Sequence, residues 1–147
     1  FAAPDKPVSI FGVGHKRNSK SQVEDTAFAL LRFPNNQILT IEVGFSVTQE
    51  KDFSYYNAFG DKGAALLNPV SVNREMHGHL VNVTPKSMLG QKDYVRQAYN
   101  LLADVFVDGV LKGVEMPIKP EHGLLVCQVT DAFYESCASG KEAVIKT

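Results

Sequence analysis

The sequence has few cysteines, almost no net charge and no long apolar run. Its 147 residues carry a formal net charge of −1, which gives no strong field toward nucleic acid or an anionic membrane surface. No apolar stretch approaches the roughly 20 residues that a membrane-spanning helix requires. We therefore expect a globular protein whose partners include neither a nucleic acid nor a membrane.

The two cysteines, Cys127 and Cys137, fall within one expected helix. Ten residues of helix rise roughly 15 Å, which is beyond the reach of a disulfide, so two buried free thiols are expected. Free thiols fit a reducing, cytoplasmic compartment, and no Cys/His spacing is typical of a metal site. The chain begins at Phe1 rather than Met, so we expect a fragment whose missing N-terminus leaves export open.

Strand patterns occupy the first part of the chain. Residues 38–47 give the clearest strand, because Leu39 and Ile41 alternate with more polar neighbours. Residues 24–33 are the expected hairpin partner, across a turn at 34–37 that Pro and Asn favour. Further strands are expected at 7–15, in a hairpin over 52–68 whose glycines at 60 and 63 allow the positive φ of a tight turn, and at 69–76, 79–85 and 142–146.

Helical patterns occupy residues 93–112 and 120–139, where apolar residues recur at helical spacing. Pro120 suits a first helical turn, and Gly113 and Gly140 suit the positions just past each helix end. The order along the chain is therefore strands, then two helices, then one strand.

This order predicts the fold class. Strands joined by short links pair mostly antiparallel, and a chain that is 44% hydrophobic can bury a core without disulfides or metals. We predict a single α+β domain over residues 1–147, a two-layer fold in which a mostly antiparallel open sheet carries two long helices packed on one face.

The stretch FGVGHKRNSK, residues 11–20, prompts the question of a phosphate-binding loop. A dinucleotide fingerprint needs G-x-G-x-x-G between a strand and a helix. Arg17 stands where the third glycine belongs, and residues 18–23 lack a helical period. We interpret the stretch as a strand end with glycines at a bend or bulge, followed by a hairpin loop, and expect no cofactor-binding residue in this chain.

Basic residues follow the second glycine, namely His15, Lys16, Arg17 and Lys20. They form either a solvated hairpin loop, which is the commoner situation, or a binding site for an anionic ligand. His122 lies in the first turn of the last helix. A surface histidine near a helix cap is commoner there, but such a histidine can also donate to a sugar-like hydroxyl or act as an acid or base.

Aromatic residues gather on one expected strand. Phe53, Tyr55 and Phe59 alternate along one face, and Tyr56 lies on the other. Aromatic rings on the open face of a sheet can bind bases or sugars, although a core or a subunit interface is commoner.

The strand at 24–33 has apolar groups on both faces, because Phe28 and Leu30 alternate with Ala29 and Leu31. Two helices cover only one face of a sheet, and an uncovered apolar face tends to be an interface. We therefore expect a homo-oligomer that associates through the open face of the sheet.

Self-sufficient catalytic patterns are absent from the sequence. His77 and His79 share a strand face without an apparent third metal ligand. No G-x-S-x-G elbow occurs, and neither cysteine has a histidine beside it. The residues alone indicate a domain that binds something or supports catalysis located elsewhere.

Three stretches, in order, resemble a known family. VEDTAFALLRFPNNQILTIEVGFS (23–46) is similar to its acidic-Asp-Thr-Ala hairpin, and YYNAFGDKGAALLN (55–68) to its YGTKG hairpin, with Asp61 in place of the usual Thr. MPIKPEHGLLVCQVTDAFYESCASGKEAVI (116–145) matches its closing pattern of proline, acidic residue, Gly-Leu, apolar helix, aromatic-x-Ser, Gly-Lys and short strand. The chain resembles the C-terminal domain of the Gfo/Idh/MocA group of NAD(P)-dependent oxidoreductases.

The resemblance implies a parent enzyme in which an N-terminal Rossmann domain holds NAD or NADP. The C-terminal domain would shape the substrate pocket and present an open sheet for subunit association. Family substrates are mostly sugars, inositols and related polyols, which react by hydride transfer at a hydroxyl-bearing carbon. The candidate substrate-binding residues are polar groups at strand ends, at a helix start or on the sheet, namely His15, Lys16, Arg17, Tyr56 and His122.

The family's catalytic motifs are missing from this chain. The string at residues 50–52, Glu-Lys-Asp, lacks the proline of the family's Glu-Lys-Pro, and no Asp-x-x-x-His occurs. We therefore expect no catalytic residue here, and no cofactor or dehydrogenase activity in the fragment by itself. The alternative is a stand-alone, non-catalytic α+β module that binds a ligand or serves as a scaffold. The reading frame upstream of Phe1 would separate the two.

Overall fold

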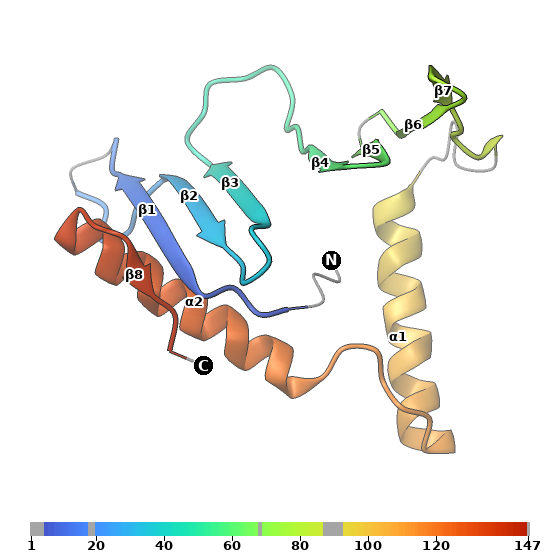
Figure 1. Cartoon of the computed structure of the whole chain (residues 1–147). Helices are drawn as coiled ribbons and strands as arrows, with labels where there is room; N and C mark the ends of the chain where they lie inside the picture. Colours follow the sequence, from blue (N-terminus) through green and yellow to red (C-terminus); the bar gives the residue numbers. More distant parts are fainter. Residues whose placement is uncertain (1–4, 18–19, 68, 87–92, 147) are drawn as a thin grey trace. The chain divides into compact units, whose positions relative to one another are not determined.

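A computed structural model describes residues 5–17, 20–67, 69–86 and 93–146. The chain divides into two compact units, the first comprising Phe1–Thr48 and Pro117–Thr147, and the second Gln49–Met116. Figure 1 shows the elements of both units in sequence colours. Neither helix of the described residues combines the length and the apolar composition needed to cross a membrane.

The first unit is an antiparallel sheet with one helix against it. The strands are β1 (Ser9–His15), β2 (Thr26–Arg32), β3 (Ile38–Gly44) and the short β8 (Ala143–Val144), in the spatial order β3-β2-β1-β8. Helix α2 (Pro120–Ser139) packs along β1 and β8 (Figure 1). The last strand of the chain is thereby paired with the first.

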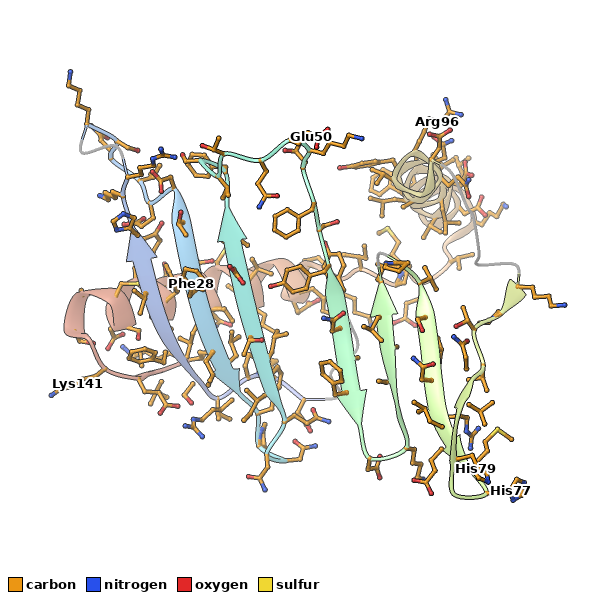
Figure 2. All side chains as sticks on the ribbon, turned by 90° about the horizontal axis from the view of Figure 1, so that it is seen from above. Phe28, Glu50, His77, His79, Arg96 and Lys141 are labelled. Atoms are coloured by element: carbon orange, nitrogen blue, oxygen red, sulfur yellow. The ribbon has the colours of Figure 1, made fainter. Side chains whose placement is uncertain are left out.

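Alternation along β1 and β2 builds the core of the first unit. The buried apolar residues come from four elements, β1, β2, α2 and β8, and from the chain just after β8: Ile10, Leu31, Ala132, Ala143 and Ile145. Their neighbours in sequence point to the opposite face because successive strand residues alternate. On that face, Phe28 is 47% exposed, and Figure 2 shows it on the side of the sheet turned away from α2.

The second unit contains an antiparallel meander and the other long helix. The strands β4 (Tyr56–Gly60), β5 (Gly63–Leu67), β6 (Ser71–Met76) and β7 (His79–Asn82) pair in sequence order. Helix α1 (Tyr94–Lys112) ends at Gly113, which has φ 66° and donates its N–H to the Gly109 carbonyl at 3.1 Å.

The predicted α+β class is confirmed, and both helices have the predicted extents to within one residue. The arrangement differs from the prediction in detail. The strands form two four-stranded sheets rather than one. In the described part of the second unit, α1 has no packing against β4–β7 comparable to that of α2 on β1. Periodicity identifies an apolar face on a helix, but it does not determine which strands that face meets.

The two predicted hairpin turns differ in their backbone conformation. The hairpin turn between β2 and β3 forms as predicted, with Asn36 at φ 62° and the Phe33 N–H bonded to the Gln37 carbonyl at 3.0 Å. The turn between β4 and β5 is in the predicted place, and Gly63 has a positive φ of 159°, whereas Gly60 does not have a positive φ. Gly63 needs to be glycine because a Cβ there would overlap the Asn73 carbonyl oxygen on β6.

Candidate functional site

The buried carboxyl group of Asp25 organises the end of β1. Asp25 is 3% exposed. Its Oδ2 accepts a 2.8 Å hydrogen bond from the backbone N–H of Arg17, and its Oδ1 accepts a 3.1 Å bond from the Thr26 hydroxyl. This placement gives a physical role to the Asp-Thr-Ala triplet, which the sequence offered only as a family likeness.

The backbone of Asp25 joins two further strand ends. Its N–H donates to the His15 carbonyl, and its carbonyl accepts from the Phe45 N–H, both at 3.0 Å. The end of β1, the start of β2 and the residue after β3 therefore meet at one aspartate. Sequence patterns identified the basic residues of this loop but not Asp25, because its partners lie in three segments of the chain.

Two cations at the start of the loop, Lys16 and Arg17, are held by main-chain oxygens. The Lys16 ammonium donates to the Gln22 carbonyl at 3.0 Å and lies 3.8 Å from Glu24 Oε1. The Arg17 guanidinium donates through Nη1 to the Ser46 carbonyl at 3.0 Å. Both side chains remain on the surface. The loop thus presents fixed positive charge, rather than the freely solvated run that basic loops usually form.

His15 differs from its two basic neighbours. It is the last residue of β1, it is exposed, and its imidazole has no hydrogen-bond partner among the described residues. An imidazole in this position can donate to or accept from a bound hydroxyl group. We call the exposed groups of His15, Lys16 and Arg17 the basic rim.

Helix α2 reaches the basic rim through Tyr134. The Tyr134 hydroxyl hydrogen-bonds to the carboxylate of Glu24, the same group that Lys16 approaches. This bond, together with the negative charge of Glu24, raises the pKa of Tyr134 above its ordinary value of 10.0. Glu24 therefore interacts both with Lys16 of the rim and with Tyr134 of the helix.

His122 lies at the other end of α2. Its Nδ1 accepts a 3.4 Å hydrogen bond from the Lys119 N–H, so the ring caps the first turn of the helix. His122 precedes Tyr134 by twelve residues, which is about 18 Å along a helix axis. The structure does not bring His122 into the basic rim.

Tyr56 is the first residue of β4 and belongs to the second unit, where it is 58% exposed. Before it, Phe53 and Tyr55 stack with their ring centroids 6.2 Å apart and their planes 10° from parallel. The five candidate residues thus lie in three places: the basic rim, the start of α2 and the start of β4.

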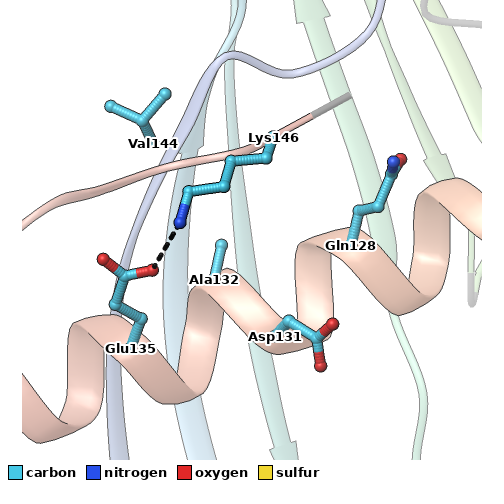
Figure 3. A pocket seen from close by; sticks show the side chains of 6 residues that line it. All are labelled: Gln128, Asp131, Ala132, Glu135, Val144 and Lys146. Atoms are coloured by element: carbon cyan, nitrogen blue, oxygen red, sulfur yellow. Dashed lines mark ion pairs between the residues drawn. The ribbon is translucent and has the colours of Figure 1, made fainter.

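A hollow lies between α2 and the C-terminal strand (Figure 3). Its volume is about 200 Å³, and it is lined by Gln128, Asp131, Ala132, Glu135, Val144 and Lys146. Lys146 and Glu135 approach to 4.0 Å across it, but both side chains are largely exposed. The hollow therefore has no buried polar group that would select a ligand.

The described residues form neither a metal site nor a disulfide. Within the described ranges, no three His, Cys, Asp or Glu side chains are placed to hold a metal ion. His77 and His79 are exposed at the β6–β7 hairpin. Both cysteines are free, but the expectation that both are buried is wrong, because Cys127 is exposed on α2 and Cys137 is only partly buried.

Comparison with known proteins identifies the family. Residues 3–146 match the sequence profile of the C-terminal alpha/beta domain of the Gfo/Idh/MocA oxidoreductase family. The chain is 25% identical to the D-glucoside 3-dehydrogenase of Escherichia coli K12 over 119 residues, which are 80% of this chain and 32% of that protein. The chain therefore spans about a third of the length of this relative.

Solved structures show the same fold. A putative myo-inositol dehydrogenase from Sinorhizobium meliloti 1021 superposes with a TM-score of 0.72 at 20% identity, over 97% of this chain and 45% of that one. The WlbA dehydrogenase from Bordetella pertussis, in complex with NADH and UDP-GlcNAcA, superposes with a TM-score of 0.70 at 16% identity, over 97% of this chain and 40% of that one. The chain belongs to the Gfo/Idh/MocA oxidoreductase family and corresponds to the C-terminal alpha/beta domain of its members.

Proposed function

We propose that the chain is the substrate-binding and oligomerisation domain of an NAD(P)-dependent oxidoreductase that acts on a sugar, an inositol or a related polyol. The observation that carries the proposal is the family match over residues 3–146. The E. coli relative is a dehydrogenase of a D-glucoside, and the S. meliloti neighbour is a putative inositol dehydrogenase. Polyhydroxylated substrates suit a surface of fixed polar donors and acceptors.

The cofactor belongs elsewhere in this proposal. Hydride transfer requires a nicotinamide held against the substrate carbon and a group that takes the hydroxyl proton. The sequence has neither the glycine loop nor the catalytic lysine motif. A Rossmann domain on the N-terminal side of the same polypeptide would bind NAD or NADP, and the present domain would be inactive alone. We place the protein in the cytoplasm, as its free thiols suggest.

The basic rim is the part of the first unit best suited to contact the substrate. Lys16 and Arg17 present fixed cations, and the free imidazole of His15 offers both a donor and an acceptor. His122 and Tyr56 stay as further candidates, each on a different part of the domain. The rim would orient hydroxyl groups of the sugar, while the chemical step would take place on residues outside this chain.

The test measures oxidation of sugars, inositols and glycosides by the protein that carries this domain, with NAD and NADP as acceptors. The variant His15→Ala removes a ring that supports no other described residue, so it should raise the substrate KM about tenfold while the cofactor KM stays unchanged. The variant His79→Ala removes an exposed histidine at a hairpin and should change neither constant. Equal KM values for the two variants would remove the rim from the substrate site.

The stand-alone module is the competing function. It predicts that the 147-residue chain binds a ligand without any nicotinamide enzyme attached. Titrating the chain with NADH and NADPH should give no saturable binding if the cofactor domain lies elsewhere. Saturable micromolar binding would contradict the division of labour proposed here, and a start codon immediately before Phe1 would favour the module.

A further inference from the structure

We infer that Asp25 is a positioning residue for substrate, because its buried carboxyl group fixes the basic rim before a ligand arrives. The inference rests on the proposed function. It adds a residue that would touch no substrate and would act through the loop between β1 and β2.

Asp25 makes four hydrogen bonds that together hold the loop, and we call this set of bonds the clamp. The side chain accepts from the Arg17 N–H at 2.8 Å and from the Thr26 hydroxyl at 3.1 Å. The backbone bonds the His15 carbonyl and the Phe45 N–H, each at 3.0 Å. One buried residue therefore holds the loop from its inner side, against the ends of three neighbouring strands.

The outer side of the loop is held by a second contact, which the side chain of Arg17 makes. The Arg17 guanidinium bonds the carbonyl of Ser46, which directly follows the Phe45 that Asp25 holds. The backbone of Arg17 is thus fixed by Asp25, while its side chain is fixed by the segment after β3. This double attachment determines which way the cation of Arg17 faces, and the bond from the Asp25 N–H to the His15 carbonyl fixes the backbone of His15.

The burial of Asp25 argues for a role in positioning. A carboxyl group at 3% exposure loses hydration, and this cost makes the burial of a charged group weak evidence for a contribution to stability. We therefore assign to Asp25 a role in fixing the conformation of the loop. A rim that is already ordered lowers the entropic cost of binding a flexible polyol, because its side chains need not be fixed on contact.

The experiment compares Asp25→Ala with Asp25→Asn in the protein that carries the domain. Asparagine can accept from the Arg17 N–H through its oxygen and donate to the Thr26 hydroxyl through its nitrogen, whereas alanine replaces neither bond. Asp25→Ala should raise the substrate KM about tenfold without a matching fall in kcat or a change in cofactor KM. Asp25→Asn should recover most of that loss.

Amide hydrogen exchange supplies a readout that needs no substrate. In Asp25→Ala the Arg17 amide should exchange at least about tenfold faster, because it loses its acceptor. The control is Ser136→Ala, which also removes buried hydrogen bonds of the first unit but lies on α2. That control should lower stability while leaving both the Arg17 exchange rate and the substrate KM unchanged.

The outcomes separate the inference from the proposed function. Unchanged exchange at Arg17 in Asp25→Ala would overturn the clamp, whatever the activity. Faster exchange with an unchanged substrate KM would overturn the positioning role, and an unchanged KM in His15→Ala as well would also remove the rim from the proposed substrate site. A raised KM in the Ser136→Ala control would show that general destabilisation is the cause.

Discussion

The backbone N–H of Gly12 on β1 donates a 2.9 Å hydrogen bond to the hydroxyl oxygen of Ser136 on α2. The same hydroxyl donates to the Lys141 carbonyl at 2.6 Å. The short strand β8 pairs only with Ser9 and Ile10, so the edge of β1 continues past it without a strand neighbour. Ser136 accepts the hydrogen bond of a main-chain donor on this edge. A side chain of the helix thus replaces the strand partner that the donor would otherwise need.

Replacing Ser136 with alanine should destabilise the first unit. The change leaves the Gly12 N–H and the Lys141 carbonyl without this partner at a position that is 0% exposed. A buried polar group left unsatisfied costs about 1–3 kcal/mol. The measurement is chemical denaturation, with Ser139→Ala as control because Ser139 is exposed and makes only bonds of 3.3–3.4 Å. Equal stabilities of the two variants would contradict the bridge.

The variant Gly12→Ala should also destabilise the first unit, for a steric reason. A Cβ on Gly12 would overlap the ring of Phe133 on α2, and overpacking of this kind costs about 1–3 kcal/mol. At Gly14 a Cβ would meet Glu24 Cγ instead, and because one methylene group of a half-buried side chain can shift more readily than the packed ring of Phe133, Gly14→Ala should cost less. Adding Phe133→Leu to Gly12→Ala should recover part of the loss in a double-mutant cycle.

The two glycines of the β4–β5 turn should respond differently to alanine. At Gly63 a Cβ would overlap the Asn73 carbonyl oxygen, which belongs to the backbone and is held in the β5–β6 ladder. At Gly60 the nearest atom to a Cβ is 3.7 Å away. Gly63→Ala should therefore cost more than about 1 kcal/mol, and Gly60→Ala much less. Urea denaturation followed by fluorescence of the tyrosines near β4 would report on this unit, and similar costs at both sites would refute the explanation.

The raised pKa of Tyr134 predicts a loss of stability in alkali. The Glu24 carboxylate accepts from the neutral phenol and repels the phenolate, so the folded protein favours the protonated form. This stabilisation is complete below the unfolded pKa of about 10 and is lost as pH rises through the higher folded pKa. Glu24→Gln should shift the Tyr134 titration back toward its ordinary range. The ultraviolet difference spectrum between each protein and its Tyr134→Phe partner isolates this phenol, and an unchanged midpoint would contradict the role of Glu24.

The local features of the fold were predictable because their causes are local. Alternation over residues 38–47 predicts β3, and Pro120 and Gly140 bound α2 as predicted. The two glycines of FGVGHKRNSK lie on a strand as expected, but the expected bend or bulge is wrong, because β1 and β2 pair in an unbroken register through Gly12 and Gly14. The local sequence does not show why position 12 requires glycine. The reason is the ring of Phe133, which packs against it although it is more than a hundred residues away in sequence.

The site was less predictable than the fold. Basic residues next to one another made the rim visible in sequence, but the clamp at Asp25 depends on Arg17, Thr26 and Phe45, which come from separate segments. His122 suggested a pocket at a helix start, whereas its ring caps the helix. The pairing of β1 with β8 joins the two ends of the chain, and periodicity carries no information about such contacts.

The open face of the first sheet predicts self-association that a single charge should weaken. Phe28 lies opposite Val13 in the β1–β2 ladder, and their side chains are 47% and 51% exposed on the face that α2 does not cover. Glu42 lies opposite Phe28 on β3, so Phe28→Glu would replace the exposed ring with a second carboxylate beside the first and should weaken association at least about tenfold. Leu124→Glu is the control, since Leu124 is an exposed apolar residue of α2, and it should leave association unchanged. Sedimentation equilibrium decides between the outcomes: a wild-type protein that stays monomeric at high concentration, or a Phe28→Glu variant that associates as tightly as the wild type, would show that this face is not the interface.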